Sequence, residues 1–210
     1  HPAYAYEDFV QGIRPQAAED GGLCYPVVPG HFLEFCARAA ERHGPCVLII
    51  DEINRAELAR VFGELMYLLE YRGRDVRLAA DRRLFHIPEN VRIIGTMNTA
   101  DRSIALVDHA LRRRFAFIAL QPNYDVLRRF HAGSGFELEG LIRVLGDLNH
   151  EIGDPNYAVG ITFFLHRPLD RHLESIWRME IVPYLEEYFF DKPARVQPFR
   201  WESIRGKVLP

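Results

Sequence analysis

Two short, largely apolar runs, each followed at once by polar residues, constrain the fold of this chain more than any other feature. They are Cys46-Val-Leu-Ile-Ile50 and Val91-Arg-Ile-Ile-Gly95, whose β-branched residues predict strands buried on both faces. Apolar residues at helical spacing over 58–70 predict a long helix between them. A third strand is expected at Phe115–Leu120, closed by Pro122. Strands separated by such helices predict a parallel α/β sheet with right-handed crossovers.

The shorter elements around this sheet follow from turn residues and apolar spacing. Residues 1–30 are rich in aromatic residues, glycine and proline, so we expect an extended segment with turns and little regular structure. A helix is expected over 31–43 and a hairpin over 71–88. Ser103 can cap a helix that runs to about Arg112.

The apolar pattern changes after residue 121, where the α/β part is expected to end. One amphipathic helix is expected over 138–148, and a second over 173–189 is expected to bend or restart at Pro183. We therefore predict two domains: an α/β core over 1–121 and a small helical domain over 122–210.

Composition excludes several classes of protein. The 26 Lys and Arg against 29 Asp and Glu give a net charge of −3, so the chain as a whole is not drawn to nucleic acid or to a membrane. No apolar run approaches the roughly 18 to 20 residues that a membrane span requires, and no leader is evident, so we expect a cytoplasmic protein with no membrane partner. Three cysteines without a Cys-x-x-Cys pair predict free thiols, and the nine histidines form no metal-ligand motif.

The first strand ends in two adjacent carboxylates, Asp51 and Glu52. Ligands of an open parallel sheet bind beyond the carboxyl ends of its strands. Nucleotide hydrolysis needs such a pair, one carboxylate to hold hydrated Mg²⁺ and a second to orient the attacking water. The alternative is a helix cap, because Asp favours the N-cap and Glu favours the first turn.

The second strand ends in Thr96-Met-Asn-Thr-Ala-Asp-Arg-Ser103, in which six of eight side chains can form hydrogen bonds. Asn98 can donate to a phosphate oxygen or a water while it accepts another hydrogen bond, which is the behaviour of a polar sensor beside a γ-phosphate. Alternatively, such residues form turns by bonding their own backbone.

Three consecutive arginines, Arg112, Arg113 and Arg114, stand where a helix is expected to meet the last strand. Guanidinium groups match phosphate bidentately and neutralise the charge that develops in phosphoryl transfer. Cations also favour a helix C-terminus, which would explain one of them. Three in succession point in different directions, so we expect at least one to face another subunit or a ligand.

These strings together resemble a known family. Leu48–Arg55, Ile94–Ser103 and Ala110–Phe115 are similar, in order and spacing, to the nucleotide-binding module of the McrB-type AAA+ GTPases, the motor subunits of modification-dependent restriction systems. Tyr4–Pro15 also looks like the family's segment after its second core strand, and Gly160–Phe164 looks like its helical lid. The resemblance implies a P-loop NTPase core, incomplete at its N-terminus, followed by a small lid.

The resemblance implies a role for each polar residue. Asp51 would hold Mg²⁺, Glu52 would be the base that orients water, and Asn98 would be the first sensor, so that these three bind the nucleotide and its metal. Other residues would act at the boundary with a neighbouring subunit. Asp101 and Arg102 belong to the loop that faces that subunit, and Arg113 and Arg114 match the arginine-finger positions, with Arg114 favoured.

The resemblance also implies cofactors and partners. The nucleotide would be GTP, with ATP as the alternative, because no residue here identifies the base. The chain would assemble into a ring, a hexamer, and would work with an McrC-like endonuclease in a system that acts on 5-methylcytosine DNA. DNA would be reached through the ring or through a reader domain outside this span. The other candidate functions are an AAA+ ATPase that remodels protein complexes and a non-catalytic scaffold of ring assembly.

A Walker A motif, Gly-x-x-x-x-Gly-Lys-Ser/Thr, does not occur in these residues; the only Gly-Lys pair is Gly206-Lys207, followed by Val208. In the family that loop lies upstream of the tyrosine-rich segment, so we expect it to precede His1 in a longer protein. The chain alone would then be inactive.

Basic residues surround the expected hairpin over 71–88. They can contact a central DNA strand or a partner in a ring. The residues favour the alternative, a solvated edge hairpin that its charges keep soluble. The arginines concerned are Arg72, Arg74, Arg77, Arg82 and Arg83.

Overall fold

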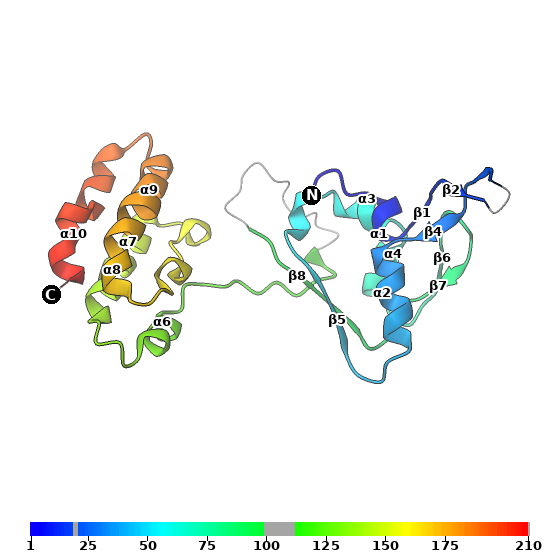
Figure 1. The fold of residues 1–210 in the computed structure, drawn as a ribbon, viewed down its shortest axis with the longest axis horizontal. Helices are drawn as coiled ribbons and strands as arrows, with labels where there is room; N and C mark the ends of the chain where they lie inside the picture. Colours follow the sequence, from blue (N-terminus) through cyan, green and yellow to red (C-terminus); the bar gives the residue numbers. More distant parts are fainter. Residues whose placement is uncertain (19–20, 99–111, 210) are drawn as a thin grey trace. The chain divides into compact units, whose positions relative to one another are not determined.

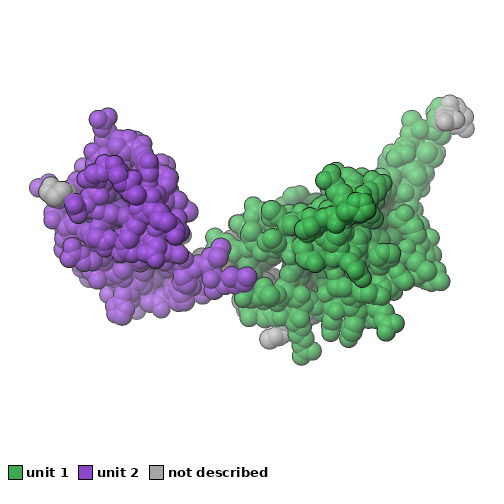
Figure 2. All heavy atoms as spheres, turned by 90° about the horizontal axis from the view of Figure 1, so that it is seen from below, with its two compact units in different colours: residues 1–117 green, residues 118–210 purple. Residues whose placement is uncertain are grey.

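A computed structural model describes residues 1–18, 21–98 and 112–209 of the chain. The chain divides into two compact units, His1–Phe117 and Ile118–Pro210 (Figure 2). Each unit has its own hydrophobic core.

Two parallel strands lie side by side in unit 1 (Figure 1). Strand β5 (Cys46–Ile50) pairs with β8 (Val91–Gly95) in register, from Cys46 opposite Val91 to Ile50 opposite Gly95. Leu48, Ile50 and Ile93 pack against the core of the unit. The parallel pairing confirms the prediction.

The expected burial of these strands on both faces is wrong for the described residues. Val47, Ile49 and Ile94 lie on the opposite face and are 48%, 66% and 51% exposed. Side chains alternate between the two faces of a strand, and no described element covers this second face.

Helices cover the core-facing side of β5 and β8, and the predictions for these helices are confirmed in part. Helix α2 (His31–Ala40) buries Phe32, Leu33, Cys36 and Ala39, and ends three residues before the expected end. The expected helix over 58–70 is two helices, α3 (Leu58–Phe62) and α4 (Leu65–Glu70). Gly63 breaks it, because its φ of +51° suits glycine and a Cβ there would lie 2.9 Å from the ring of Tyr6.

The first 30 residues hold more regular structure than expected. Helix α1 (Tyr6–Phe9) leads into β1 (Gln11–Ile13), which pairs antiparallel with β4 (Val27–Pro29). A smaller ladder joins β2 (Gln16–Ala17) to β3 (Leu23–Cys24). The aromatic residues explain the order, because Phe9 is buried against Phe32 and Phe62, with ring centroids 5.1 and 4.8 Å apart.

The remaining elements of unit 1 give one confirmation and one correction. Strands β6 (Val76–Arg77) and β7 (Leu84–Phe85) form the predicted antiparallel hairpin. The predicted strand at Phe115–Leu120 is wrong: among the described residues these six have no strand partner, and Leu120 is 92% exposed. An apolar run becomes a strand only when a neighbour accepts its backbone hydrogen bonds. The helix predicted from Ser103 lies mostly outside the described residues.

Unit 2 is helical, as predicted. The expected helix over 138–148 is α7 (Leu138–Ile152), preceded by α6 (Tyr124–His131) and crossed by α10 (Trp201–Val208). Gly140 permits this crossing, because a Cβ there would lie 2.0 Å from the carbonyl oxygen of Lys207. Three short 3-10 helices connect the others: Pro155–Tyr157, Ile161–Phe164 and Pro193–Phe199.

The helix expected over 173–189 is continuous but unevenly wound. Helix α8 (Leu169–Ile176) passes through a π-helical turn, Trp177–Ile181, into α9 (Val182–Tyr188). Pro183 lies in the first turn of α9, directly after the π-helical turn, so the irregularity predicted at this proline is present as a change of winding within one continuous helix and not as a restart. None of the helices among the described residues combines the length and the apolar character of a membrane-spanning helix.

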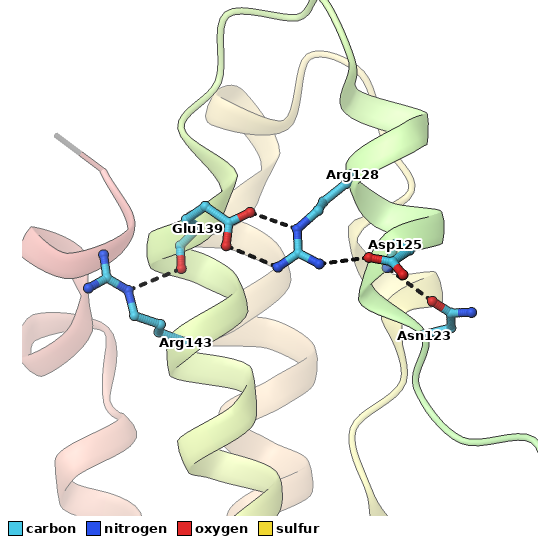
Figure 3. A network of polar contacts seen from close by, with 5 residues as sticks. All are labelled: Asn123, Asp125, Arg128, Glu139 and Arg143. Atoms are coloured by element: carbon cyan, nitrogen blue, oxygen red, sulfur yellow. Dashed lines mark hydrogen bonds and ion pairs between the residues drawn. The ribbon is translucent and has the colours of Figure 1, made fainter.

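A network of charged side chains ties α6 to α7 on the surface of unit 2 (Figure 3). Arg128 donates to both carboxylate oxygens of Glu139, at 2.7 and 3.0 Å, and to Asp125 at 2.8 Å. The hydrogen bond from Arg128 holds the pKa of Glu139 below its usual value. Because the pKa of Glu139 is lowered in the folded protein, the stabilisation by this ion pair is fully present at a pH above the usual pKa of a glutamate. It is lost as the pH falls through the lowered pKa.

The cysteines are free thiols, as predicted, and they differ in exposure. Cys36 is buried in α2, and burial raises the pKa of its thiol to about 12, although Arg72 acts in the opposite direction. The thiolate is the reactive form, so iodoacetamide at pH 8 should alkylate the exposed Cys24 and leave Cys36 unmodified, as read by mass spectrometry. Chemical denaturation should expose both. Equal labelling rates in the folded protein would contradict the burial of Cys36.

Candidate functional site

The register of the parallel pair brings the two polar clusters together at one edge of the sheet. Ile50 lies opposite Gly95, so Asp51 and Thr96 follow at the same level. The ladder extends beyond the strands, since the Thr96 N–H donates to the carbonyl of Ile50 at 3.0 Å and the Ile53 N–H donates to the carbonyl of Thr96 at 2.9 Å. The carboxyl ends of β5 and β8 therefore form one continuous polar edge, as the sequence predicts.

Thr96 joins the two predicted carboxylates. Its hydroxyl donates a short hydrogen bond to the Asp51 carboxylate and accepts one from the Glu52 N–H at 3.2 Å. One side chain thus fixes both the carboxylate of Asp51 and the backbone of Glu52. Sequence reasoning included Thr96 in the polar cluster but gave it no role; its place directly after the strand was the available signal.

Glu52 occupies an unusual backbone conformation. Its φ of 52° and ψ of 47° place it in the left-handed region, which costs a residue other than glycine about 1 kcal/mol or more. Its carboxylate lies 3.1 Å from the guanidinium of Arg55, and its side chain is 39% exposed. Within the described residues it makes no capping hydrogen bond to the short 3-10 helix η1 (Ile53–Arg55) that follows, so the helix-cap alternative is not supported.

The backbone of Asn98, after β8, is held at this edge by Asn54 of η1, after β5. The side-chain amide of Asn54 donates to the backbone carbonyl of Asn98 at 3.3 Å. Asn54 is only 9% exposed, whereas Asn98 is exposed. The amide oxygen of Asn54 has no hydrogen-bond partner among the described residues, which leaves an acceptor beneath the site. Sequence reasoning missed Asn54, because a buried asparagine cannot be told from a surface one by residue type.

The donors at this edge fit a hydrated Mg²⁺. Mg²⁺ prefers oxygen ligands, keeps several waters and binds through one or two carboxylates together with substrate phosphates. Asp51 supplies an exposed carboxylate, and the Thr96 hydroxyl lies within hydrogen-bond distance of it. No group of three His, Cys, Asp or Glu side chains that could hold a metal occurs in the described part of the chain, so an all-protein cage is not formed there.

The three arginines differ in their surroundings. The guanidinium of Arg112 lies over the ring of Phe117, 5.6 Å from its centroid. Arg114 is 19% exposed and lies 3.0 Å from the carboxylate of Glu70, at the end of α4 in the same chain. Arg113 is exposed. The other two predicted residues of the subunit boundary, Asp101 and Arg102, lie outside the described residues.

Comparison with known families gives two matches. Residues 1–115 match the AAA domain of the dynein-related subfamily, and residues 140–197 match the α-helical lid domain of McrB. The matches lie in unit 1 and unit 2 respectively. They confirm the predicted fold class, an AAA+ core followed by a helical lid.

Two curated relatives cover this chain to different extents. The Type IV methyl-directed restriction enzyme EcoKMcrB subunit of Escherichia coli (strain K12) is 40% identical over 97% of this chain and 48% of that protein. The Type II restriction enzyme BsuMI component YdiS of Bacillus subtilis (strain 168) is 33% identical over 55% of this chain and 37% of that protein. This chain thus spans about half or less of the length of these relatives. With an AAA domain over its first half and an McrB lid over its second, the chain belongs to the McrB-type AAA+ proteins.

Proposed function

We propose that this chain is the nucleotide-hydrolysing module of a motor subunit in a modification-dependent restriction system. The observation that carries the proposal is the single polar edge formed by Asp51, Glu52, Thr96 and Asn98 at the carboxyl ends of β5 and β8. Both relatives are components of restriction enzymes. GTP is the proposed nucleotide, from the family resemblance, and ATP is the alternative.

Each residue of the edge has one proposed task. Asp51 holds Mg²⁺, which, when bound, neutralises charge on the nucleotide phosphates. Thr96 fixes the orientation of the Asp51 carboxylate through its hydrogen bond. Glu52 orients the attacking water and takes up its proton, and Asn98 donates to a phosphate oxygen or to that water.

A second subunit is proposed to complete the site. A ring, a hexamer, would place arginines of one copy against the nucleotide of the next, where their charge stabilises phosphoryl transfer. The exposure of Arg113 supports it as the residue that crosses, because Arg114 is mostly buried and pairs with Glu70 of its own chain. This reverses the preference for Arg114 that the resemblance suggested. Asp101 and Arg102 remain proposed residues of the same boundary.

The wider proposal concerns partners outside this chain. Nucleotide turnover would drive translocation on 5-methylcytosine DNA and would activate an McrC-like endonuclease subunit. Splitting the site between subunits would link each hydrolysis event to a movement at their interface. The names of the two relatives supply the restriction context of this proposal.

Turnover of GTP and ATP by the full-length protein, with and without its nuclease partner, tests the proposal. We expect Mg²⁺-dependent hydrolysis that is faster with GTP and rises when the partner is added. Asp51→Asn should lower the turnover and weaken its dependence on Mg²⁺, because the metal loses its carboxylate. Asp147→Asn, which changes an exposed carboxylate on α7, is the matched control and should behave as wild type. Hydrolysis of neither nucleotide would refute the proposal.

A further inference from the structure

The β6–β7 hairpin (Figure 1) carries several arginines, and backbone hydrogen bonds close its loop. The ladder continues past the strands, since the Leu78 N–H donates to the carbonyl of Arg83 at 2.9 Å and the Arg82 N–H donates to that of Leu78 at 3.1 Å. Arg82 takes a φ of 61°, which closes the loop, and Arg77 donates to its carbonyl at 3.3 Å. The loop therefore brings Arg77 and Arg82 side by side.

The body of unit 1 anchors this loop from beneath. Leu78 is fully buried, and the Glu64 carboxylate accepts from the Ala79 N–H at 2.9 Å and from the Tyr6 hydroxyl at 2.6 Å. Burial and the hydrogen bond to Glu64 raise the pKa of Tyr6, so the hydroxyl remains a donor at neutral pH. Arginines on an anchored loop lose less conformational freedom when they bind a partner.

Some arginines of the hairpin contact other groups of unit 1, and others are exposed and form no ion pair among the described residues. Arg72 is partly buried and donates to the carbonyl of Val91 at 2.7 Å, and Arg83 lies 3.7 Å from the carboxylate of Asp81. Arg74, Arg77 and Arg82 are exposed, and within the residues that the structure describes no carboxylate lies at ion-pair distance from them. Three exposed guanidinium groups thus lie within residues 74–82, which we call the hairpin edge, in a chain whose net charge is −3.

The chemistry of this edge suits phosphate better than a protein surface. Protein interfaces have an apolar or aromatic core inside a polar rim, and among the described residues 74–86 Leu84, 57% exposed, is the one large apolar side chain that is exposed. Interfaces with DNA are more polar and strongly positive, and exposed arginines supply fixed donors to phosphate oxygens. We propose that Arg74, Arg77 and Arg82 bind the phosphate backbone of DNA without reading its sequence, an inference that rests on the proposed function as a motor acting on DNA.

The salt dependence of DNA binding by the full-length protein tests this proposal. Each phosphate contact contributes about 0.9 to the slope of log K against log salt concentration. The triple variant Arg74→Gln/Arg77→Gln/Arg82→Gln should therefore lose about 2 to 3 from the slope for an unmodified duplex of about 30 base pairs, and at about 0.15 M salt it should bind that duplex about 10²-fold more weakly. Glutamine preserves side-chain length and avoids further strain at Arg82.

A matched control separates a local effect from the loss of three charges. Arg38→Gln/Arg60→Gln/Arg171→Gln removes three exposed arginines from α2, α3 and α8 and should keep the wild-type slope. Arg74→Gln alone, which leaves the loop bonds intact, should still lower the slope by about 0.9 if the triple variant does not fold. The lysine variants at all three positions should keep most of the slope.

An unchanged slope in a folded triple variant would overturn the proposal. If that variant also loses binding to the nuclease subunit, the hairpin arginines contact a protein and not DNA. Nucleotide turnover without DNA is measured in parallel, so a failure of the proposed hydrolase function shows in the wild-type protein and leaves the slope comparison readable.

Discussion

Replacing Glu52 with glutamine should lower nucleotide turnover of the full-length protein by about 10²- to 10⁴-fold and leave nucleotide binding almost unchanged. Glutamine keeps the shape of the side chain and the left-handed backbone at this position, but it cannot accept a proton from the attacking water. Asp51 and its hydrogen bond from Thr96 are untouched, so the proposed metal ligand stays in place. Turnover is measured by phosphate release, and binding by fluorescence of a labelled nucleotide.

A close match for this variant lies five residues further along the chain. Glu57 forms an ion pair with Arg60 at 3.7 Å, with the same three-residue spacing as Glu52 and Arg55 at 3.1 Å. Glu57 is 68% exposed and directly precedes α3, whereas Glu52 follows the end of β5. Glu57→Gln should therefore turn over nucleotide at the wild-type rate. Equal losses in both variants, or none in either, would remove Glu52 from the proposed role.

The sequence sufficed to predict the acidic edge, because that edge depends on local patterns. Apolar runs such as Cys46–Ile50 form strands, and parallel strands bring their carboxyl ends together. The bridge made by Thr96 could not be predicted in detail, since it joins residues 44 and 45 positions apart and depends on register. A shift of one residue would have turned Thr96 to the other face of the sheet.

Features that depend on contacts between distant residues were mispredicted. The helical spacing over 58–70 continues through Gly63, and only the packing of Tyr6 against it explains why the helix breaks there. The run Phe115–Leu120 has the composition of a strand but no described neighbour to pair with. In both cases the local pattern was read correctly and the tertiary context overrode it.

The arginines were predicted as a group, and the structure separates them. Residue type alone could not distinguish Arg113 from Arg114, because the distinction depends on Glu70, which reaches Arg114 from the end of α4. An arginine that is 19% exposed and paired in its own chain is less able to reach a neighbouring subunit. The exposure of Arg113 and the ion pair of Arg114 therefore predict different effects for their substitution.

Arg113→Ala should reduce turnover of the assembled protein by about 10³-fold or more, the effect of removing an arginine that stabilises phosphoryl transfer from a neighbouring subunit. Its exposure means that the substitution should leave the thermal unfolding midpoint near that of wild type. Arg114→Ala should instead lower that midpoint, because the substitution removes a mostly buried side chain and its ion pair with Glu70. The two variants thus separate a catalytic loss from a structural one.

Mixing subunits provides the decisive measurement for Arg113. In a ring whose interfaces are head to tail, Arg113→Ala and Glu52→Gln subunits damage opposite sides of each shared site, so random mixing in equal amounts leaves about a quarter of the interfaces with both residues intact. Turnover in the mixture should recover to a corresponding fraction of wild type, although each variant alone is nearly inactive. Arg60→Ala, which removes an exposed arginine from α3, is the control and should be active without mixing. If the mixture stays inactive while gel filtration shows that the subunits co-assemble, Arg113 does not act across the interface, because only a residue that serves its own subunit's site fails to complement.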